Sequence, residues 1–156
     1  MLEQLRVVQG GEAGSFYDLE TLLGEIVRDY FPAAERPQIH WGRKISRKKR
    51  RSIRLGSYYR PTATIRVHPH LNTPAVPRFF IQSIVYHEML HHVLGPAHNA
   101  RFHRQERRFH YHREAREWLR RNLAVLLGFR ERPDRRRPMA PQAVPAARQQ
   151  QLALFW

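Results

Sequence analysis

The chain has 156 residues, enough for one domain and a tail, with 28 Lys and Arg against 13 Asp and Glu and a net charge of +15. It contains no cysteine, which excludes disulfides, a cysteine nucleophile and metal sites built from thiolates. No apolar run reaches the roughly 20 residues of a membrane span, and the first residues lack the pattern of a signal peptide. We therefore expect a cytoplasmic protein without a membrane partner, whose positive charge attracts nucleic acid.

An amphipathic helix is expected over residues 16–30, FYDLETLLGEIVRDY. Its apolar side chains recur at helical spacing from Phe16 to Tyr30, Ser15 is the predicted N-cap, and Pro32 follows the end of the helix.

Strand-like segments follow this helix at residues 38–42, 51–59 and 63–69. In the last of them, Ile65 and Val67 alternate with Arg66 and His68, as in a strand with one buried face. We therefore expect a small three-stranded sheet.

A run of basic residues separates the first two strand segments. It is interpreted either as a solvated hairpin loop or as a finger that contacts a phosphate backbone, and a finger would also be solvated. The candidate nucleic-acid-binding residues are Arg43, Lys44, Arg47, Lys48, Lys49, Arg50 and Arg51. Unpaired bases could also stack on Trp41, Tyr58 or Tyr59, although burial is the stronger expectation for Trp41.

Two long helices are expected in the second half of the chain. The first, RFFIQSIVYHEMLHHVL, is strongly apolar and ends at Gly95-Pro96. The second runs from about Asn99 to Leu127, with a buried stripe of Phe102, Phe109, Trp118, Leu119, Leu123 and Leu126. Beyond it the chain is rich in Pro, Ala and Arg, as linkers are. We therefore divide the chain into a folded domain, 1–128, a disordered linker, 129–150, and a terminal motif, 151–156.

The sequence YHEMLHH carries the chemistry. His87 and His91 are four positions apart, so on a helix both imidazoles point the same way, one turn apart. This spacing can place two nitrogens on one zinc ion, with Glu88 as a general base for a water molecule at the open coordination position. The chain then reverses at LGPAHN, which returns His98 toward the pair and makes it the first candidate for the third ligand.

Other residues compete for these roles. His103, His110 or His112 could replace His98, and a ligand set of two histidines and one glutamate could use Glu106, Glu114 or Glu117. Glu106 is instead favoured as a carboxylate that orients a ligand imidazole. His92 is turned about 100° from His91 on a helix and is assigned to packing or surface. An oxyanion would need a donor such as Tyr111 or an arginine, and the pattern does not choose between them.

Residues 63–69 bear on the substrate. If this strand lies at the sheet edge above the metal helix, an extended peptide can pair with it and present a carbonyl to the metal. Peptide hydrolysis is then more natural than attack on a small molecule.

Several segments together resemble the SprT-like, or Spartan-like, family of zinc metalloproteases, which includes proteases that degrade proteins crosslinked to DNA. The segments are RLGSYY, IRVHPHLN, VPRFFIQSIVYHEMLHH and HNARFHRQERRF followed by WLRRNL, within roughly residues 38–123. The resemblance implies an α+β, minimal zincin-like domain in which His87, His91 and His98 bind Zn²⁺ and Glu88 is the catalytic base. Phe102 would be the aromatic residue after the third ligand.

Two departures limit what the resemblance implies. Many members carry a Cys-rich zinc ribbon after the protease domain, and this chain has no cysteine. The connection between the motif and His98 is also short. The ribbon's function therefore does not carry over, and arginine-rich surfaces would have to bind DNA in its place.

The first functional hypothesis is a zinc metalloprotease that acts on DNA-bound or DNA-crosslinked proteins, associated with the nucleoid. The alternative is a basic nucleic-acid-binding protein with a structural or vestigial zinc site. Glu88 favours the enzyme, because a purely structural site has no use for a base beside an open position. A metal-dependent hydrolase of small molecules is a weaker third option.

The last residues, QQQLALFW, are apolar in a polar tail. Gln151, Leu152, Leu154 and Phe155 resemble the Gln-Leu-x-Leu-Phe motif that docks bacterial replication and repair proteins on the DNA sliding clamp. Leucine and phenylalanine anchors would fill an apolar pocket while the glutamine bonds at its rim. The competing interpretation is that these side chains, with Trp156, fold back onto the protein's own surface.

Overall fold

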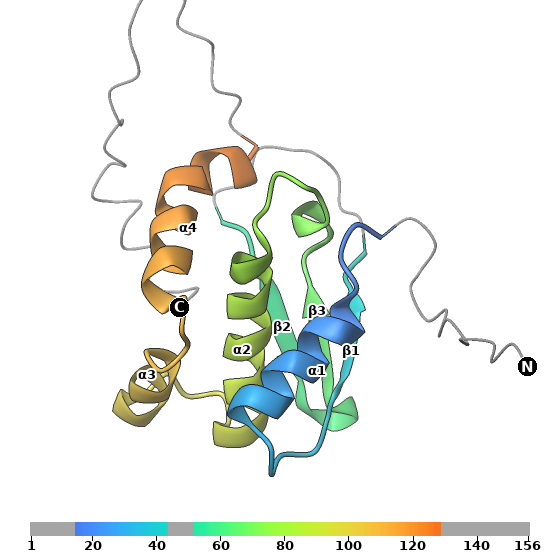
Figure 1. The fold of residues 1–156 in the computed structure, drawn as a ribbon, viewed down its shortest axis with the longest axis vertical. Coiled ribbons are helices and arrows are strands. Elements are labelled where there is room, and N and C mark those ends of the chain that lie inside the picture. The colour runs from blue at the N-terminus through green and yellow to red at the C-terminus, as the bar shows by residue number, and fades with distance from the viewer. Residues whose placement is uncertain (1–14, 44–51, 129–156) are drawn as a thin grey trace, which may run out of the picture.

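The computed structural model describes residues 15–43 and 52–128. Within them the chain forms four α-helices and a three-stranded sheet, which confirms the predicted α+β class (Figure 1). The elements are α1 (Leu19–Tyr30), β1 (Gln38–Trp41), β2 (Gly56–Tyr59), β3 (Thr64–Val67), α2 (Arg78–Leu94), α3 (Ala100–Glu106) and α4 (His112–Leu126), with short 3-10 turns at Arg60–Thr62 and Pro69–Leu71.

Helix α1 begins at Leu19 because Asp18 caps it. The Asp18 carboxylate accepts hydrogen bonds from the Glu20 backbone N–H at 3.0 Å and from the Thr21 hydroxyl at 2.5 Å. The prediction of Ser15 as the N-cap was wrong. Its hydroxyl instead accepts the Trp41 indole N–H at 2.8 Å. Phe16, placed in the buried stripe by its spacing, is 56% exposed because it precedes the helix.

The sheet has the order β1-β3-β2, with β1 parallel and β2 antiparallel to β3. Strand β3 is therefore central, so the condition under which residues 63–69 would pair with an extended peptide, a position at the sheet edge, is not met. Strand β3 pairs with a neighbouring strand on both sides: Ile65 is opposite Ile39 of β1 and Tyr58 of β2. The two edge strands among those described are β1 and β2, and β2 is the one that packs against α2, the helix that carries His87 and His91.

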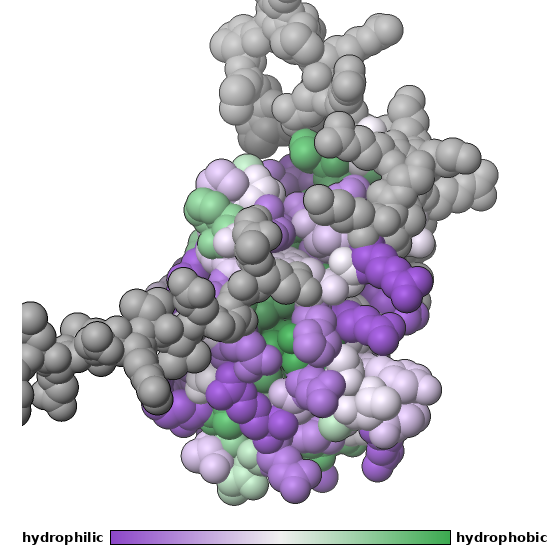
Figure 2. Space-filling view, turned by 90° about the vertical axis from the view of Figure 1, so that its right-hand side faces the viewer, coloured by the Kyte–Doolittle hydropathy of each residue, from purple (hydrophilic) through white to green (hydrophobic). Residues whose placement is uncertain are grey.

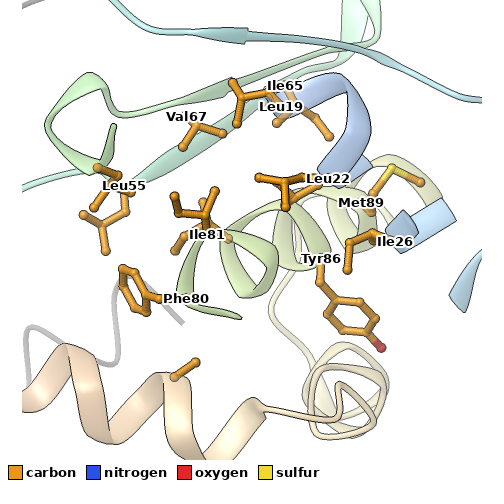
Figure 3. Packing of buried hydrophobic residues seen from close by; sticks show 14 of the residues in the cluster. Leu19, Leu22, Ile26, Leu55, Ile65, Val67, Phe80, Ile81, Tyr86 and Met89 are labelled. Carbon is orange, nitrogen blue, oxygen red and sulfur yellow. The ribbon is translucent and has the colours of Figure 1, made fainter. Parts of the chain in front are cut away.

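Helix α2 lies at the centre of the molecule. Helices α1 and α2 pack on one face of the sheet, and α3 and α4 pack on the far side of α2 (Figures 1 and 3). Phe80, Ile81 and Met89 of α2 are fully buried, and they meet Leu22 of α1 and the sheet in one core. A helix covered on several sides needs apolar residues around most of its circumference, which explains the composition of this segment.

The second predicted long helix is broken into α3 and α4. The Tyr86 hydroxyl donates to the Gln105 carbonyl at 2.7 Å, and the Tyr30 hydroxyl accepts the His110 backbone N–H at 3.2 Å. Phe109 turns into the core between the two helices. Of the predicted stripe, Phe102, Phe109, Leu119 and Leu123 are buried, whereas Trp118 and Leu126 are only partly buried.

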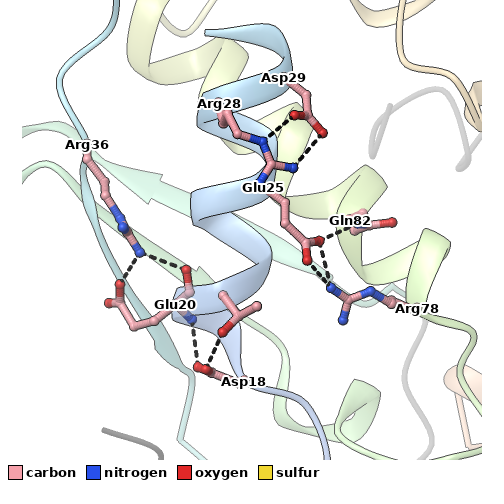
Figure 4. A network of polar contacts seen from close by, with 9 residues as sticks. Asp18, Glu20, Glu25, Arg28, Asp29, Arg36, Arg78 and Gln82 are labelled. Carbon is pink, nitrogen blue, oxygen red and sulfur yellow. Dashed lines mark hydrogen bonds and ion pairs between the residues drawn. The ribbon is translucent and has the colours of Figure 1, made fainter. Parts of the chain in front are cut away.

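Polar contacts fasten α1 to its neighbours (Figure 4). Glu25 accepts hydrogen bonds from Arg78 at 2.5 and 2.6 Å and from Gln82 at 3.0 Å, which joins α1 to α2. Arg36 donates to the backbone and the side chain of Glu20, both at 2.7 Å. These pairs are partly exposed, so they orient the helix more than they stabilise it.

Hydrophilic residues cover most of the coloured surface in Figure 2, with a narrow hydrophobic strip between them. In the described part of the chain, the exposed large hydrophobic side chains come from separate segments: Phe16, Tyr59, Val93, Tyr111 and Val125. None of the helices in the described ranges is long and apolar enough to cross a membrane.

Candidate metal centre

Three imidazoles converge at the end of α2. His87 Nε2 lies 3.2 Å from His91 Nε2 and 3.2 Å from His98 Nε2. Together the three residues form a group that could hold a metal ion. A tetrahedral zinc ion with Zn–N bonds of about 2.0–2.1 Å places its ligand nitrogens about 3.3 Å apart. The two distances from His87 Nε2 match this value, and the ligand atoms of all three histidines lie within 4.8 Å of one another.

The turn after α2 returns His98 to the site. Gly95 has a φ of 94°, in the left-handed region that favours glycine, and its N–H bonds to the His91 carbonyl at 3.1 Å. Asn99 then caps α3 by accepting the Phe102 N–H at 3.0 Å. The fully buried Phe102 ring lies 4.6–5.1 Å from the three histidine rings and forms the floor beneath them.

Hydrogen bonds fix the tautomers of His87 and His91. His87 Nδ1 lies 2.7 Å from the Glu106 carboxylate, and His91 Nδ1 lies 3.0 Å from the Gly95 carbonyl. Both partners are acceptors, so each neutral ring carries its proton on Nδ1. The two Nε2 atoms then direct lone pairs at each other across 3.2 Å, an arrangement that a bound cation stabilises.

Burial favours the neutral form of two of the three imidazoles, those of His91 and His98. It lowers the pKa of His91, helped by the nearby His87 and His98 and opposed by the bond to Gly95. Burial also lowers the pKa of His98, with a further contribution from His87. A lowered pKa leaves the imidazole unprotonated at neutral pH, as metal binding requires.

Glu106 lies directly behind His87. It is 2% exposed, and its second oxygen contacts His103 Nδ1 at 3.2 Å. Burial alone would raise its pKa, but the hydrogen bonds with His87 and His103 hold the pKa of Glu106 below its ordinary value. Glu106 is therefore a carboxylate that can orient the His87 ring. The sequence favoured this role for Glu106.

Glu88 faces a cleft of about 400 Å³ in front of the histidines. The cleft is lined by Arg54–Tyr58, Arg60, Ile84, His87, Glu88, His91, Gly95, Pro96 and His98. Burial raises the pKa of Glu88 to about 7, although His87 and Arg54 lower it. No donor in the described part of the chain bonds to this carboxyl, so its oxygens can accept a proton from a water molecule in the cleft.

The other wall of the cleft is the edge strand β2. His68 N–H donates to the Leu55 carbonyl at 2.8 Å, which makes these two residues a hydrogen-bonded pair of the antiparallel ladder. By the alternation of such ladders, Gly56 and Tyr58 direct their N–H and C=O groups away from β3. Both residues line the cleft, so these groups are the ones available to an extended ligand.

The competing candidates lie elsewhere. His103 is engaged with Glu106, and His110 is exposed between α3 and α4. Glu117 pairs with Arg120 and Arg121 on α4. His112, Glu114 and Tyr111 are also outside the residues that line the cleft, and the arginines that do line it are Arg54 and Arg60. Among the described residues, these two arginines line the cleft and Tyr111 does not.

Sequence reasoning missed the role of the strand. Gly56, Tyr58 and Arg54 line the cleft although they were assigned only to a strand or to stacking. A glycine inside a strand often marks a close approach of another group, and that signal was present in RLGSYY. His92, assigned to packing or surface, bonds to the Tyr58 hydroxyl at 2.8 Å.

Of the predicted DNA-contacting basic residues and clamp-docking residues, the structure describes only Arg43. Arg43 is exposed beyond β1, and the other basic candidates, Lys44 to Arg51, lie outside the described residues. So do the linker and the terminal motif from Gln151 to Phe155. No model of a known protein family matches the chain, and no curated protein matches it.

Proposed function

We propose that this chain is a zinc-dependent metallopeptidase. The observation that carries the proposal is the convergence of three imidazole Nε2 atoms beside the buried carboxyl of Glu88, in one cleft. Among the described residues only three side chains meet there, which leaves a coordination position open, as catalytic zinc sites require. A structural site would have a fourth protein ligand and no need of a base.

Each residue then has a stated task. His87, His91 and His98 would hold the ion, and Glu106 would keep His87 in the correct tautomer. When bound, zinc supplies Lewis acidity toward a water molecule and a carbonyl. Glu88 accepts the proton from the attacking water and returns it to the leaving amine. Arg54 and Arg60 are donors that can face the developing negative charge.

The edge position of β2 in the described sheet is the feature that favours a peptide as the substrate. An extended chain pairing with Gly56 and Tyr58 would run along β2, opposite the metal ligands, with its main-chain groups satisfied. The sequence suggested edge pairing for residues 63–69 only if they lay at the sheet edge. Since β3 is central, we propose β2 for this role instead.

The test is Glu88→Gln, with Glu114→Gln as a matched control at an exposed position of α4. The first variant should retain zinc, measured by elemental analysis, and lose cleavage of an unfolded protein substrate by at least about a hundredfold. The control should cleave normally. Undiminished cleavage by Glu88→Gln would refute the enzyme and leave the nucleic-acid-binding alternative.

The substrate class we propose is protein bound or crosslinked to DNA. The support is the net charge of +15 together with the basic residues around Arg43. DNA affinity should fall steeply between low and physiological salt. Lysine and arginine side chains that bind phosphates release the counterions condensed on DNA, and this release is less favourable at higher salt. Binding measured by fluorescence anisotropy that stays flat across this range would contradict the proposal.

Recruitment to the bacterial sliding clamp is proposed from residues 151–155 alone. A pull-down of the purified clamp should lose its signal when Leu154 and Phe155 are both changed to Ala. Retention of the clamp by this double variant would show that the terminal residues do not dock there.

A further inference from the structure

Gly56 packs directly against Glu88. A methyl group built on its α-carbon would lie 2.5 Å from Glu88 Oε1, 2.7 Å from Ile84 Cγ2 and 3.0 Å from Glu88 Cγ. The residue belongs to an extended strand and does not have a positive φ, so its backbone conformation is open to any residue. Glycine is required here for space alone.

The strand cannot withdraw to make room for a side chain. On one side of Gly56, the Leu55 carbonyl is held by the His68 N–H at 2.8 Å. On the other side, the Tyr58 hydroxyl bonds to His92 Nδ1 at 2.8 Å, and His92 Nε2 bonds in turn to the Glu35 carbonyl at 3.0 Å. Since that carbonyl needs a donor, Nε2 carries the proton and Nδ1 accepts from the tyrosine.

The group that would yield is the Glu88 side chain. Its carboxyl is at the end of a flexible chain, whereas Ile84 is a buried part of the α2 packing. A side chain at position 56 would therefore turn the carboxyl away from its place in the cleft and leave the histidines where they are.

We propose that Gly56 is a positioning residue for Glu88: the bare strand backbone holds the carboxyl in the cleft beside the three imidazoles. The catalytic consequence rests on the proposed peptidase function, whereas the contact between positions 56 and 88 does not. Tyr58 and His92 fix the same strand on α2 two residues further along.

The kinetic test compares Gly56→Ala with Gly42→Ala, a control in which the added methyl meets only ordinary contacts at 3.5 and 3.6 Å. Both variants should bind zinc within about twofold of the unsubstituted protein. In Gly56→Ala, kcat should fall about tenfold or more while KM changes less, because the base is displaced and the edge strand is not. A kcat equal to that of Gly42→Ala overturns the inference.

A stability cycle separates this contact from catalysis. Gly56→Ala should lower the Tm of the protein, and it should lower it less in a Glu88→Ala background, which lacks two of the three colliding atoms and keeps only Ile84 Cγ2. Equal losses in the two backgrounds overturn the inference. If Gly56→Ala does not fold, restored folding in the double variant supports the contact and continued failure overturns it. The absence of hydrolysis by the unsubstituted protein would refute the peptidase, and this cycle would still decide the role of Gly56.

Discussion

His87 and His91 differ in the group that holds their second ring nitrogen. For His87 it is a buried carboxylate on α3, and for His91 it is a backbone carbonyl at the end of its own helix. The Gly95 carbonyl is part of the backbone and is present whatever the side chain, whereas the carboxylate is lost if Glu106 is substituted. Glu106 is therefore the more vulnerable of the two supports.

We expect Glu106→Ala to weaken zinc binding by about ten- to a hundredfold, because His87 loses the acceptor that fixes its tautomer. Glu106→Gln should lose less, since the amide oxygen can still accept from Nδ1. Competition with a chromophoric chelator measures both affinities. An unchanged affinity in Glu106→Ala would show that the phenylalanine floor alone orients the ring.

Individual site residues could be predicted from the sequence where their relative placement depends only on residues close by in the chain. The positions of His87 and His91 follow from one helical turn, and that of His98 from the glycine turn after it. The partner of Gly56 could not be predicted, because it depends on the direction in which an edge strand crosses α2.

Among the elements, α1 shows how a helix terminus responds to acid. Hydrogen bonds from the Thr21 hydroxyl and from backbone N–H groups together outweigh the opposing effect of burial and hold the pKa of Asp18 below its ordinary value of 3.8. The cap therefore contributes stability above pH 3.8, and this contribution is lost as the pH falls through the lower, folded-state pKa.

Asp18→Ala should lower the free energy of unfolding by about 1 kcal/mol at pH 7. The difference from the unsubstituted protein should shrink as the pH falls from 3.8 through the lower, folded-state pKa, at which the cap is protonated. Urea unfolding at several pH values measures it. Asp29→Ala, at an exposed site near the C-terminal end of α1, is the control and should cost less at pH 7. A penalty for Asp18→Ala that does not depend on pH would contradict this account.

The break between α3 and α4 could not be predicted from local pattern. Residues 107–111 contain neither proline nor glycine, and their composition favours a continuous helix. The interruption comes from hydroxyl groups of Tyr30 and Tyr86, which lie 80 and 19 positions away from the backbone groups they bond. Tertiary contacts of this kind override local propensity.

For the molecule as a whole, the central place of α2 joins stability to the site. The helix that carries His87, Glu88 and His91 is also the element on which α1, the sheet and α4 pack. The α+β class was predictable because each element has a clear apolar pattern. The strand order was not, since short strands of similar character leave the pairing open.

The third candidate ligand, His98, lies on a different segment from the other two, eleven positions beyond His87. An ion held by all three would act as a cross-link, fastening the segment from Gly95 to Glu106 to the end of α2. Local opening of that segment would then require the loss of a coordinate bond.

We therefore expect zinc to slow amide hydrogen exchange from Gly95 to Glu106 far more than in α1, which contributes no ligand. Exchange measured by mass spectrometry with and without a chelator tests this, and equal slowing in both regions would contradict it. Metal supply would then decide more than whether the cleft is reactive: in a zinc-starved cell the segment from Gly95 to Glu106 would open more readily than it does with the ion bound.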